Sequence, residues 1–125
     1  MKLSPLLSKD KQVIKAYDSS GFDVNGKHYN ASIFVTSNQT EIWNVEGDPQ
    51  KLKYSDFEEY ISNKNLDVLL VGTGIKFVMI PQQLRQSMRN VGIGVECMDT
   101  AAGCRTYNIL LSEGRSVAAA LMIAG

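Results

Sequence analysis

The second half of the chain alternates strand and helix patterns, and this alternation constrains the fold more than any other feature. Residues Asp67 to Gly72 (DVLLVG) contain a continuous apolar run, which is typical of a strand covered on both faces. The predicted elements after it are a helix from Pro81, a strand over Gly94 to Met98, a helix to about Ser112 and a strand over Ser116 to Ile123. Strands that alternate with helices pair in parallel, so we expect an α/β sheet with helices on its faces.

The two helices of this half have recognisable ends. Pro81 suits the first turn of the earlier helix, and Gly92 is a typical residue to end it. Asp99 and Thr100 are both good N-caps for the later helix. The apolar stripe of the earlier helix is expected to comprise Leu84, Met88 and Val91.

The first half of the chain is predicted to form strands and turns. Asn25-Gly26, between Phe22 to Val24 and the run from Lys27, is a strong hairpin signal because Asn-Gly tolerates the positive φ angles of a type I′ turn. Further strands are predicted over Gln12 to Tyr17, Ser32 to Thr36 and Glu41 to Val45. We therefore expect one domain over residues 1–125, with an N-terminal β-hairpin layer beside a central mixed, partly parallel sheet, and with residues 1–11 loosely ordered.

A short helix is predicted between the two halves. Ser55 and Glu58 have the spacing of a capping box, with Ser55 as the N-cap and Glu58 reaching back to it. Phe57, Tyr60 and Ile61 follow at helical spacing, so this helix is expected to bury one face.

Composition excludes several classes of protein. The 125 residues are 44% hydrophobic, and 13 Lys and Arg balance 13 Asp and Glu. A formal net charge of zero argues against a nucleic-acid binder, which needs surplus cations to displace counterions. No apolar run approaches the ~20 residues that cross a bilayer, so an integral membrane protein is not expected. The N-terminus resembles neither a secretory signal nor a transit peptide, so we expect a cytoplasmic location.

One edge of the predicted sheet gathers the candidate binding site. Right-handed crossovers place Gly72-Thr73-Gly74 and Asp99-Thr100 together, at the kind of edge where open α/β sheets bind ligands. Free amides at the helix start attract anions, and Arg105 would add a guanidinium group. The G-x-G segment lacks the third glycine of a phosphate-binding fingerprint. The alternative is therefore a tight strand exit in which Asp99 is only a helix cap.

Glu96 and Arg105 are the charged residues of this candidate site. Glu96 lies inside an apolar strand, and a buried carboxylate would need a partner, for which Arg105 and Arg115 are the candidates. A role in the site, a structural ion pair and exposure at the strand end all remain open for Glu96. We expect Arg105 to contact Glu96, Asp99 or the backbone of Gly72 to Gly74, and not to project into solvent.

The sequence contains no recognisable catalytic arrangement, and no catalytic residue, metal ligand or cofactor is predicted. His28 is the only histidine and lies beside the predicted hairpin turn, without an identifiable nucleophile or base. Two cysteines, Cys97 and Cys104, are too few for a zinc site or a disulfide scaffold. Reduced, partly buried thiols are expected, and a reactive Cys104 in the first turns of a helix is the alternative.

Three segments resemble one small protein family: LLVGTG at 69–74, GIGVECMDTAAGCRTYNILLSEGR at 92–115 and VAAAL at 117–121. The chain is similar to the adipogenesis-associated Mth-type domain family of unknown function, which includes bacterial and archaeal proteins and a mitochondrial complex I assembly factor. The resemblance is densest over residues 67–123, and it implies a compact α/β domain without an established catalytic activity. Gly103 stands where the family pattern usually has alanine, which favours close packing or extra flexibility.

Three functions follow as hypotheses. The first is a non-enzymatic protein-interaction or assembly-factor-like module with an unidentified protein partner, and weak homo-oligomerisation is left open. The second is a small-molecule or anion-binding protein, or an enzyme, whose candidate ligand-binding residues are Gly72, Thr73, Gly74, Glu96, Asp99, Thr100 and Arg105. The third is a thiol redox protein, which requires Cys104 to be exposed and acidic.

Overall fold

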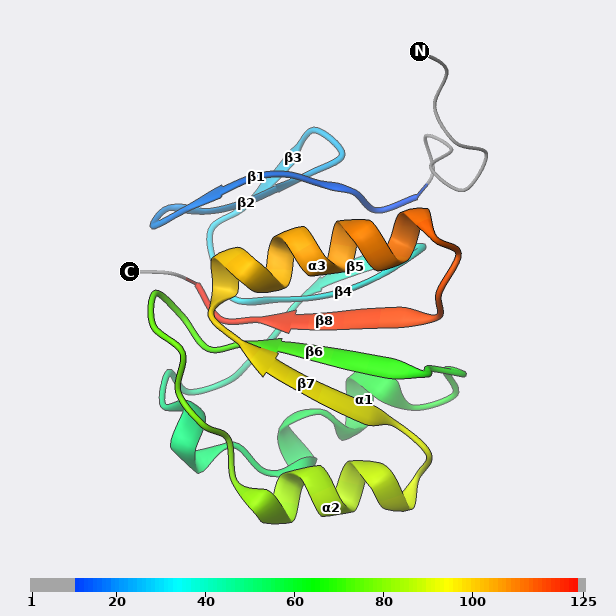
Figure 1. The fold of residues 1–125 in the computed structure, drawn as a ribbon. Coiled ribbons are helices and arrows are strands. Elements are labelled where there is room, and N and C mark those ends of the chain that lie inside the picture. The colour runs from blue at the N-terminus through cyan, green and yellow to red at the C-terminus, as the bar shows by residue number, and fades with distance from the viewer. Residues whose placement is uncertain (1–10, 124–125) are drawn as a thin grey trace.

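The computed structural model describes residues 11–123, and a five-stranded sheet organises it (Figure 1). The strand order is β5-β4-β8-β6-β7. These strands are β4 (Ile33–Thr36), β5 (Gln39–Ile42), β6 (Val68–Gly72), β7 (Gly94–Met98) and β8 (Val117–Leu121). β6 is parallel to β7 and β8, whereas β4 is antiparallel to β5 and β8. The sheet is mixed and partly parallel, which confirms the predicted fold class.

An antiparallel three-stranded sheet forms the N-terminal layer. Its strands are β1 (Ile14–Asp18), β2 (Gly21–Val24) and β3 (Lys27–Tyr29), in that order. Asn25 and Gly26 join β2 to β3 with φ angles of 50° and 87°, as a type I′ turn requires. The predicted hairpin is therefore confirmed. The expectation of loose order over residues 1–11 lies outside the described residues, apart from Lys11.

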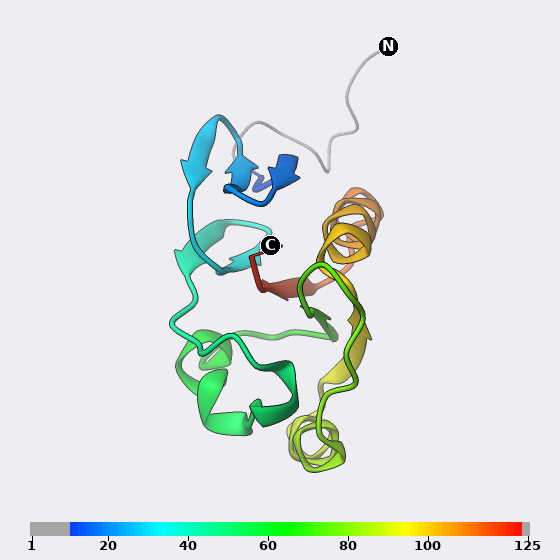
Figure 2. The same cartoon turned by 90° about the vertical axis from the view of Figure 1, so that its left-hand side faces the viewer.

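The helices cover both faces of the five-stranded sheet (Figures 1 and 2). α3 (Thr100–Ser112) lies on one face, between this sheet and the N-terminal layer. α1 (Glu58–Ile61) and α2 (Gln82–Asn90) lie on the other face, with short 3-10 turns at Pro49–Lys51 and Tyr54–Asp56 before them. Within residues 11–123, no helix is both long enough and apolar enough to cross a membrane.

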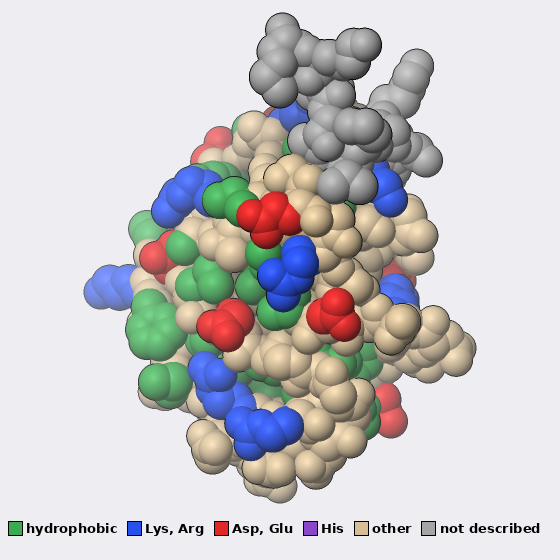
Figure 3. Space-filling model, turned by 45° about the vertical axis from the view of Figure 1, so that its right-hand side comes forward, with side chains coloured by type: hydrophobic (Ala, Val, Ile, Leu, Met, Phe, Trp, Pro, Cys, Tyr) green, Lys and Arg blue, Asp and Glu red, His purple; other side chains and the backbone are tan. Residues whose placement is uncertain are grey.

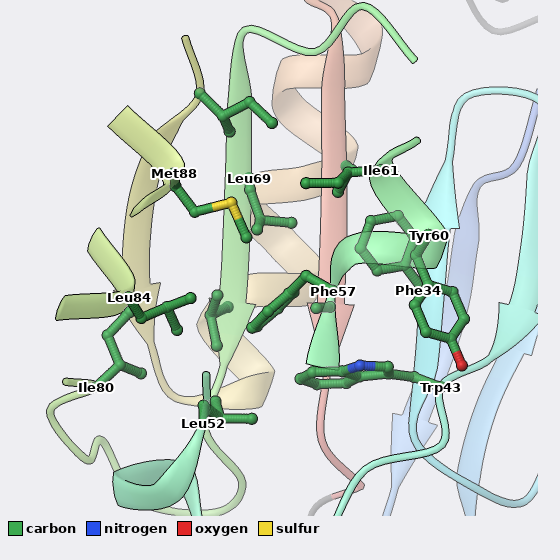
Figure 4. Packing of buried hydrophobic residues seen from close by; sticks show 14 of the residues in the cluster. Phe34, Trp43, Leu52, Phe57, Tyr60, Ile61, Leu69, Ile80, Leu84 and Met88 are labelled. Carbon is green, nitrogen blue, oxygen red and sulfur yellow. The ribbon is translucent and has the colours of Figure 1, made fainter. Parts of the chain in front are cut away.

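Each face of the sheet has its own hydrophobic core, because successive strand residues point to opposite faces. In β6, Leu69 and Val71 face α1 and α2, whereas Leu70 faces α3. Figure 4 shows the first core, in which the Trp43 and Phe57 rings lie 5.1 Å apart. The apolar run of β6 is thus covered on both faces, as its sequence predicts.

The predicted capping box at Ser55 and Glu58 is wrong. The carboxylate of Asp56 accepts the backbone N–H of Lys53 at 2.9 Å, which tightens the chain into a 3-10 turn. The Asp56 carbonyl accepts the indole N–H of Trp43 at 2.8 Å, and the backbone N–H of Tyr60 donates to Phe57 instead of to Asp56. α1 therefore begins only at Glu58, although its Phe57, Tyr60 and Ile61 are buried as predicted.

Two other boundaries differ from the sequence prediction. The strand expected over Glu41 to Val45 is β5 at Gln39–Ile42, because Thr36 pairs with Gln39 across a two-residue turn. α2 ends at Asn90, and the following Val91 is exposed and does not extend the apolar stripe of Leu84 and Met88. Gly92 follows with a φ of +83°, so the predicted stop signal is confirmed.

Candidate functional site

The strands β6 and β7 end side by side, where α3 begins. The backbone N–H of Thr73 donates to the Met98 carbonyl at 2.9 Å, and the N–H of Thr100 donates to the Gly74 carbonyl at 2.9 Å. The structure therefore brings together five of the predicted site residues, namely Gly72, Thr73, Gly74, Asp99 and Thr100. We call these five residues the strand-end clamp.

Two threonine hydroxyls hold the strand-end clamp together. Thr100 is 1% exposed, and its hydroxyl donates to the Met122 carbonyl at 2.6 Å while accepting the N–H of Gly74 at 2.8 Å. The hydroxyl of Thr73 donates to the Lys76 carbonyl at 2.8 Å and accepts the N–H of Val78 at 3.0 Å. Both side chains thus bind the chain's own backbone groups.

Glycine at position 72 allows α3 to approach the sheet closely. A Cβ atom at Gly72 would lie 2.9 Å from Cδ2 of Leu121 and 3.0 Å from Cα of Thr100, which is too close for an unstrained side chain. A Cβ atom at Gly103, in the first turns of α3, would also lie 2.9 Å from the same Leu121 atom. Close packing is therefore what Gly103 provides in this fold.

Asp99 caps α3. Its side chain accepts the backbone N–H of Ala102 at 2.8 Å, which confirms the prediction that this residue is an N-cap. The carboxylate occupies the position at the helix start where an external anion would bind.

Glu96 and Arg105 do not join the strand-end clamp. β7 is an edge strand, so Glu96 is exposed, and among residues 11–123 no Lys or Arg nitrogen lies within 4.0 Å of its carboxylate. Arg105 is also exposed, and its Nη1 donates to the hydroxyl of Tyr17 in β1 at 2.9 Å. The prediction that Arg105 contacts Glu96, Asp99 or Gly72 to Gly74 is wrong, because its side chain reaches the N-terminal layer.

The cysteines do not form a reactive site. Cys104 is buried against the N-terminal layer, and burial raises the pKa of its thiol to about 12. This contradicts the redox hypothesis, which requires an exposed and acidic Cys104. Burial also raises the pKa of the half-buried Cys97, whose thiol donates to the Val78 carbonyl at 3.3 Å. Within the described part of the chain, no three His, Cys, Asp or Glu side chains are placed to hold a metal ion.

His28 has a carboxylate partner that the sequence analysis missed. Nδ1 of His28 lies 2.7 Å from the Asp23 carboxylate, and Nε2 lies 3.0 Å from the Ser20 carbonyl. These contacts, led by the hydrogen bond to Asp23, raise the pKa of His28 above 6.5. The Asn25-Gly26 turn was the available signal, since it fixes the register that places Asp23 opposite His28.

The outer side of β7 forms an open sheet edge. Gly94 donates its N–H to Asp67 of the adjacent chain segment, and the Met98 carbonyl accepts from Thr73. Backbone groups alternate in direction along a strand, so the N–H groups of Val95 and Cys97 point away from β6. We call this side of Gly94–Met98 the β7 edge. A surface hollow of about 390 Å³ lies beside it, lined by Arg85, Arg89 and residues 92–96.

A second surface feature missed by the sequence analysis is the loop after the strand-end clamp. Ile75, Phe77 and Met79 are 76%, 53% and 60% exposed, whereas Ile80 is buried. We call residues 75–79 the apolar loop. The signal in the sequence was three large hydrophobic residues, Ile75, Phe77 and Met79, within five positions of a predicted connection, although a sequence gives no general rule for which loop residues face solvent.

Comparison with known proteins relates this chain to one described family and to curated proteins. Residues 14–122 match the family described as "Protein of unknown function (DUF498/DUF598)". The chain is 34% identical over 110 residues to NADH dehydrogenase (ubiquinone) 1 alpha subcomplex assembly factor 3 of Rattus norvegicus, covering 87% of this chain and 59% of that protein. The chain thus spans less than two thirds of the curated relative's length.

Solved structures agree with this relationship. A crystal structure of a Bordetella parapertussis protein superposes with a TM-score of 0.83 at 32% identity, covering 90% of this chain and 96% of that one. A solution structure of a Bordetella pertussis protein, described as a Mth938-like domain, has a TM-score of 0.80 at 27% identity, covering 100% and 94%. These findings confirm the family resemblance drawn from residues 69–74, 92–115 and 117–121.

Proposed function

The chain belongs to the DUF498/DUF598 family of proteins of unknown function, and on that premise we propose that it is a non-enzymatic protein-interaction module of the assembly-factor type. The rat relative is named as an assembly factor, which supports a role in binding other proteins. The proposal places this role in the cytoplasm, as the sequence analysis expects. It includes no nucleic-acid partner, since the net charge is zero.

The open β7 edge is the observation that carries this proposal. An edge strand with free outward backbone groups is a template for another strand, and proteins use it to bind extended segments of their partners. The backbone N–H and C=O groups of Val95 and Cys97 point outward, and the adjoining hollow offers space for side chains of a bound segment. The Val95 carbonyl is engaged by Nη1 of Arg85 at 3.0 Å, so Arg85 must move for full strand pairing.

Charge indicates which segment suits the β7 edge. Glu96 lies at the centre of β7, exposed and without a cation within 4.0 Å among the described residues. A partner strand with Lys or Arg opposite Glu96 would gain a cross-strand pair. Two copies of this chain would instead place Glu96 opposite Glu96 when Val95 and Cys97 pair, and facing like charges are destabilising. We therefore propose a different protein as the partner, whose extended segment carries Lys or Arg opposite Glu96 and no cation toward the hollow where Arg85 and Arg89 lie.

Affinity enrichment from the source cell, with quantitative mass spectrometry, tests this proposal. Wild type should retain a near-stoichiometric partner. Glu96→Lys and Val95→Pro should each recover at least about five-fold less of that partner, since a cross-strand charge pair contributes up to about 1 kcal/mol. Proline is tolerated on an edge strand where the lost N–H faces outward, so Val95→Pro should still fold. Thermal melting curves check that every variant is folded.

Glu41→Lys is the matched control for charge, because Glu41 lies in β5 at the opposite edge of the same sheet. It should leave the partner's recovery unchanged. Recovery of the same proteins by all four chains, or no stoichiometric partner with wild type, would contradict the proposal.

A further inference from the structure

The apolar loop carries an inference that is independent of the β7 edge. It exposes three large hydrophobic side chains, Ile75, Phe77 and Met79, close together on one short connection between β6 and α2. Figure 2 shows this connection crossing in front of the ends of the strands, on the outside of the molecule. Single exposed hydrophobic residues are common, but a cluster of this kind usually marks a contact surface.

The fold holds the apolar loop in place. The Thr73 hydroxyl binds both the Lys76 carbonyl and the Val78 N–H, inside the loop itself. The thiol of Cys97 donates to the Val78 carbonyl, and the buried Ile80 anchors the end of the loop. A surface that is ordered before binding loses little conformational entropy when it binds. The outward direction of the three hydrophobic side chains is therefore built into the fold.

The chain segment that contains the apolar loop carries charges of one sign, although the carboxylates of Glu96 and Asp99 follow it on β7 and at the start of α3. Residues 68–95 contain no Asp or Glu, but they contain Lys76, Arg85 and Arg89. Lys76 is exposed between the hydrophobic side chains of Ile75 and Phe77. Figure 3 shows blue Lys and Arg side chains gathered over the end of the molecule where α2 lies. This segment is therefore locally cationic, although the chain as a whole is neutral.

We infer that the apolar loop binds reversibly to the surface of an anionic lipid bilayer, inserting Ile75, Phe77 and Met79 between the headgroups. Hydrophobic side chains beside cations are the combination that binds such surfaces, because burial of apolar area adds to attraction by anionic lipids. The loop stands out from the strand ends and contributes few residues. A protein interface usually engages about 20–30 residues on each side, so a lipid surface matches the loop better.

Sedimentation of the full chain with lipid vesicles tests this inference. Wild type should bind vesicles of phosphatidylcholine mixed with phosphatidylglycerol, bind less to phosphatidylcholine alone, and bind less in high salt. Phe77→Ser should weaken binding about ten-fold, because a buried Phe side chain is lost. Lys76→Ser should weaken it about five-fold on anionic vesicles and have little effect on neutral ones.

Ile109 supplies the matched control, since it is 57% exposed but lies on α3. Ile109→Ser should leave vesicle binding unchanged. Tryptophan fluorescence gives a second readout, because the native Trp43 is buried and should not respond. Phe77→Trp should shift to shorter wavelength when anionic vesicles are added, and Ile109→Trp should not.

Failure of wild type to bind anionic vesicles would overturn the inference. Equal losses in Phe77→Ser and Ile109→Ser would also overturn it, because binding would then be non-specific. If Phe77→Ser instead abolished capture of a protein and vesicles had no effect, the loop would be a protein-binding surface. That outcome is separate from the β7 edge, which Glu96→Lys tests.

Discussion

The strand-end clamp and the apolar loop are consecutive in sequence, yet they use their side chains in opposite ways. In the clamp, the hydroxyls of Thr73 and Thr100 bind backbone groups of the same chain, and Asp99 caps its own helix. Two residues beyond Thr73, the side chain of Ile75 projects into solvent. The comparison teaches that the residues most suggestive of a ligand site in the sequence are engaged in holding the fold together.

This difference separates stability from function within one short segment. Changes in the strand-end clamp should destabilise the protein, because they disturb buried hydrogen bonds or close packing. Changes in the apolar loop or at the β7 edge should alter binding and leave stability nearly unchanged. Single substitutions in each region can locate the boundary between the two behaviours.

Thr100→Val should have the largest effect on stability. Valine has a similar shape but cannot bind the Gly74 N–H or the Met122 carbonyl, which both contact the buried Thr100 hydroxyl. Leaving two backbone groups unpaired should lower the free energy of unfolding by about 2–4 kcal/mol, measured by urea denaturation. The half-buried Thr106 on the same helix is the control, and Thr106→Val should cost less than about 0.5 kcal/mol. Equal effects would show that the hydroxyl of Thr100 is not special.

Gly72→Ala should have the next largest effect. The added methyl group would lie 2.9 Å from Leu121 Cδ2 and 3.0 Å from Thr100 Cα, so α3 must shift from the sheet. We expect a loss of about 1–3 kcal/mol in the free energy of unfolding, as for other overpacked sites. Gly47→Ala has nothing within 4 Å of the new methyl group and should be nearly neutral. A stable Gly72→Ala protein would mean that α3 does not need this close approach.

Arg105→Lys should have little effect, which would place Arg105 outside the strand-end clamp. The guanidinium is exposed and makes one hydrogen bond, at 2.9 Å, to the Tyr17 hydroxyl. We expect less than about 0.5 kcal/mol of destabilisation in thermal or urea unfolding. A loss of about 1 kcal/mol or more would point to a buried contact of Arg105 and contradict the geometry.

His28 should contribute the smallest effect, visible only as a pH dependence. Its pKa is raised in the folded protein, mainly by the hydrogen bond to Asp23, so its protonated form favours folding. This stabilisation is complete below the unfolded pKa of about 6.5 and is lost as the pH rises through the folded value. The stability difference between wild type and His28→Gln should therefore shrink from pH 5 to pH 9. A difference that grows with pH would reverse the assignment.

Local sequence patterns predicted most of the elements of this fold. The Asn25-Gly26 hairpin, the double-faced run of β6 and the Asp99 cap all depend on neighbouring residues, so the sequence contains the information. The position of a strand within a sheet does not depend on neighbouring residues in the sequence. A site role, an ion pair and exposure were all open for Glu96, and its exposure follows from the place of β7 at the sheet edge, an order that depends on contacts between distant segments.

The partners of long side chains were predicted least well, for the same reason. Arg105 could reach several groups near its own helix, but it binds Tyr17, which is 88 residues earlier in the chain. The packing of the N-terminal layer on α3 decides this contact, and no local pattern predicts it. The meeting of the Gly72 to Gly74 segment with Thr100 was predictable, because parallel strands and right-handed crossovers fix it.

Amide hydrogen exchange, read by NMR, tests most directly whether the strand-end clamp is closed while the apolar loop is open. The account predicts that the N–H groups of Gly74 and Thr100, bonded to the Thr100 hydroxyl and the Gly74 carbonyl, exchange slowly, near the rate set by global unfolding. The N–H groups of Ile75 and Phe77 should exchange much faster, and added inorganic phosphate should change none of the four. Fast exchange at Gly74 and Thr100 that phosphate slows would contradict the account, and would show instead a ligand site at this edge.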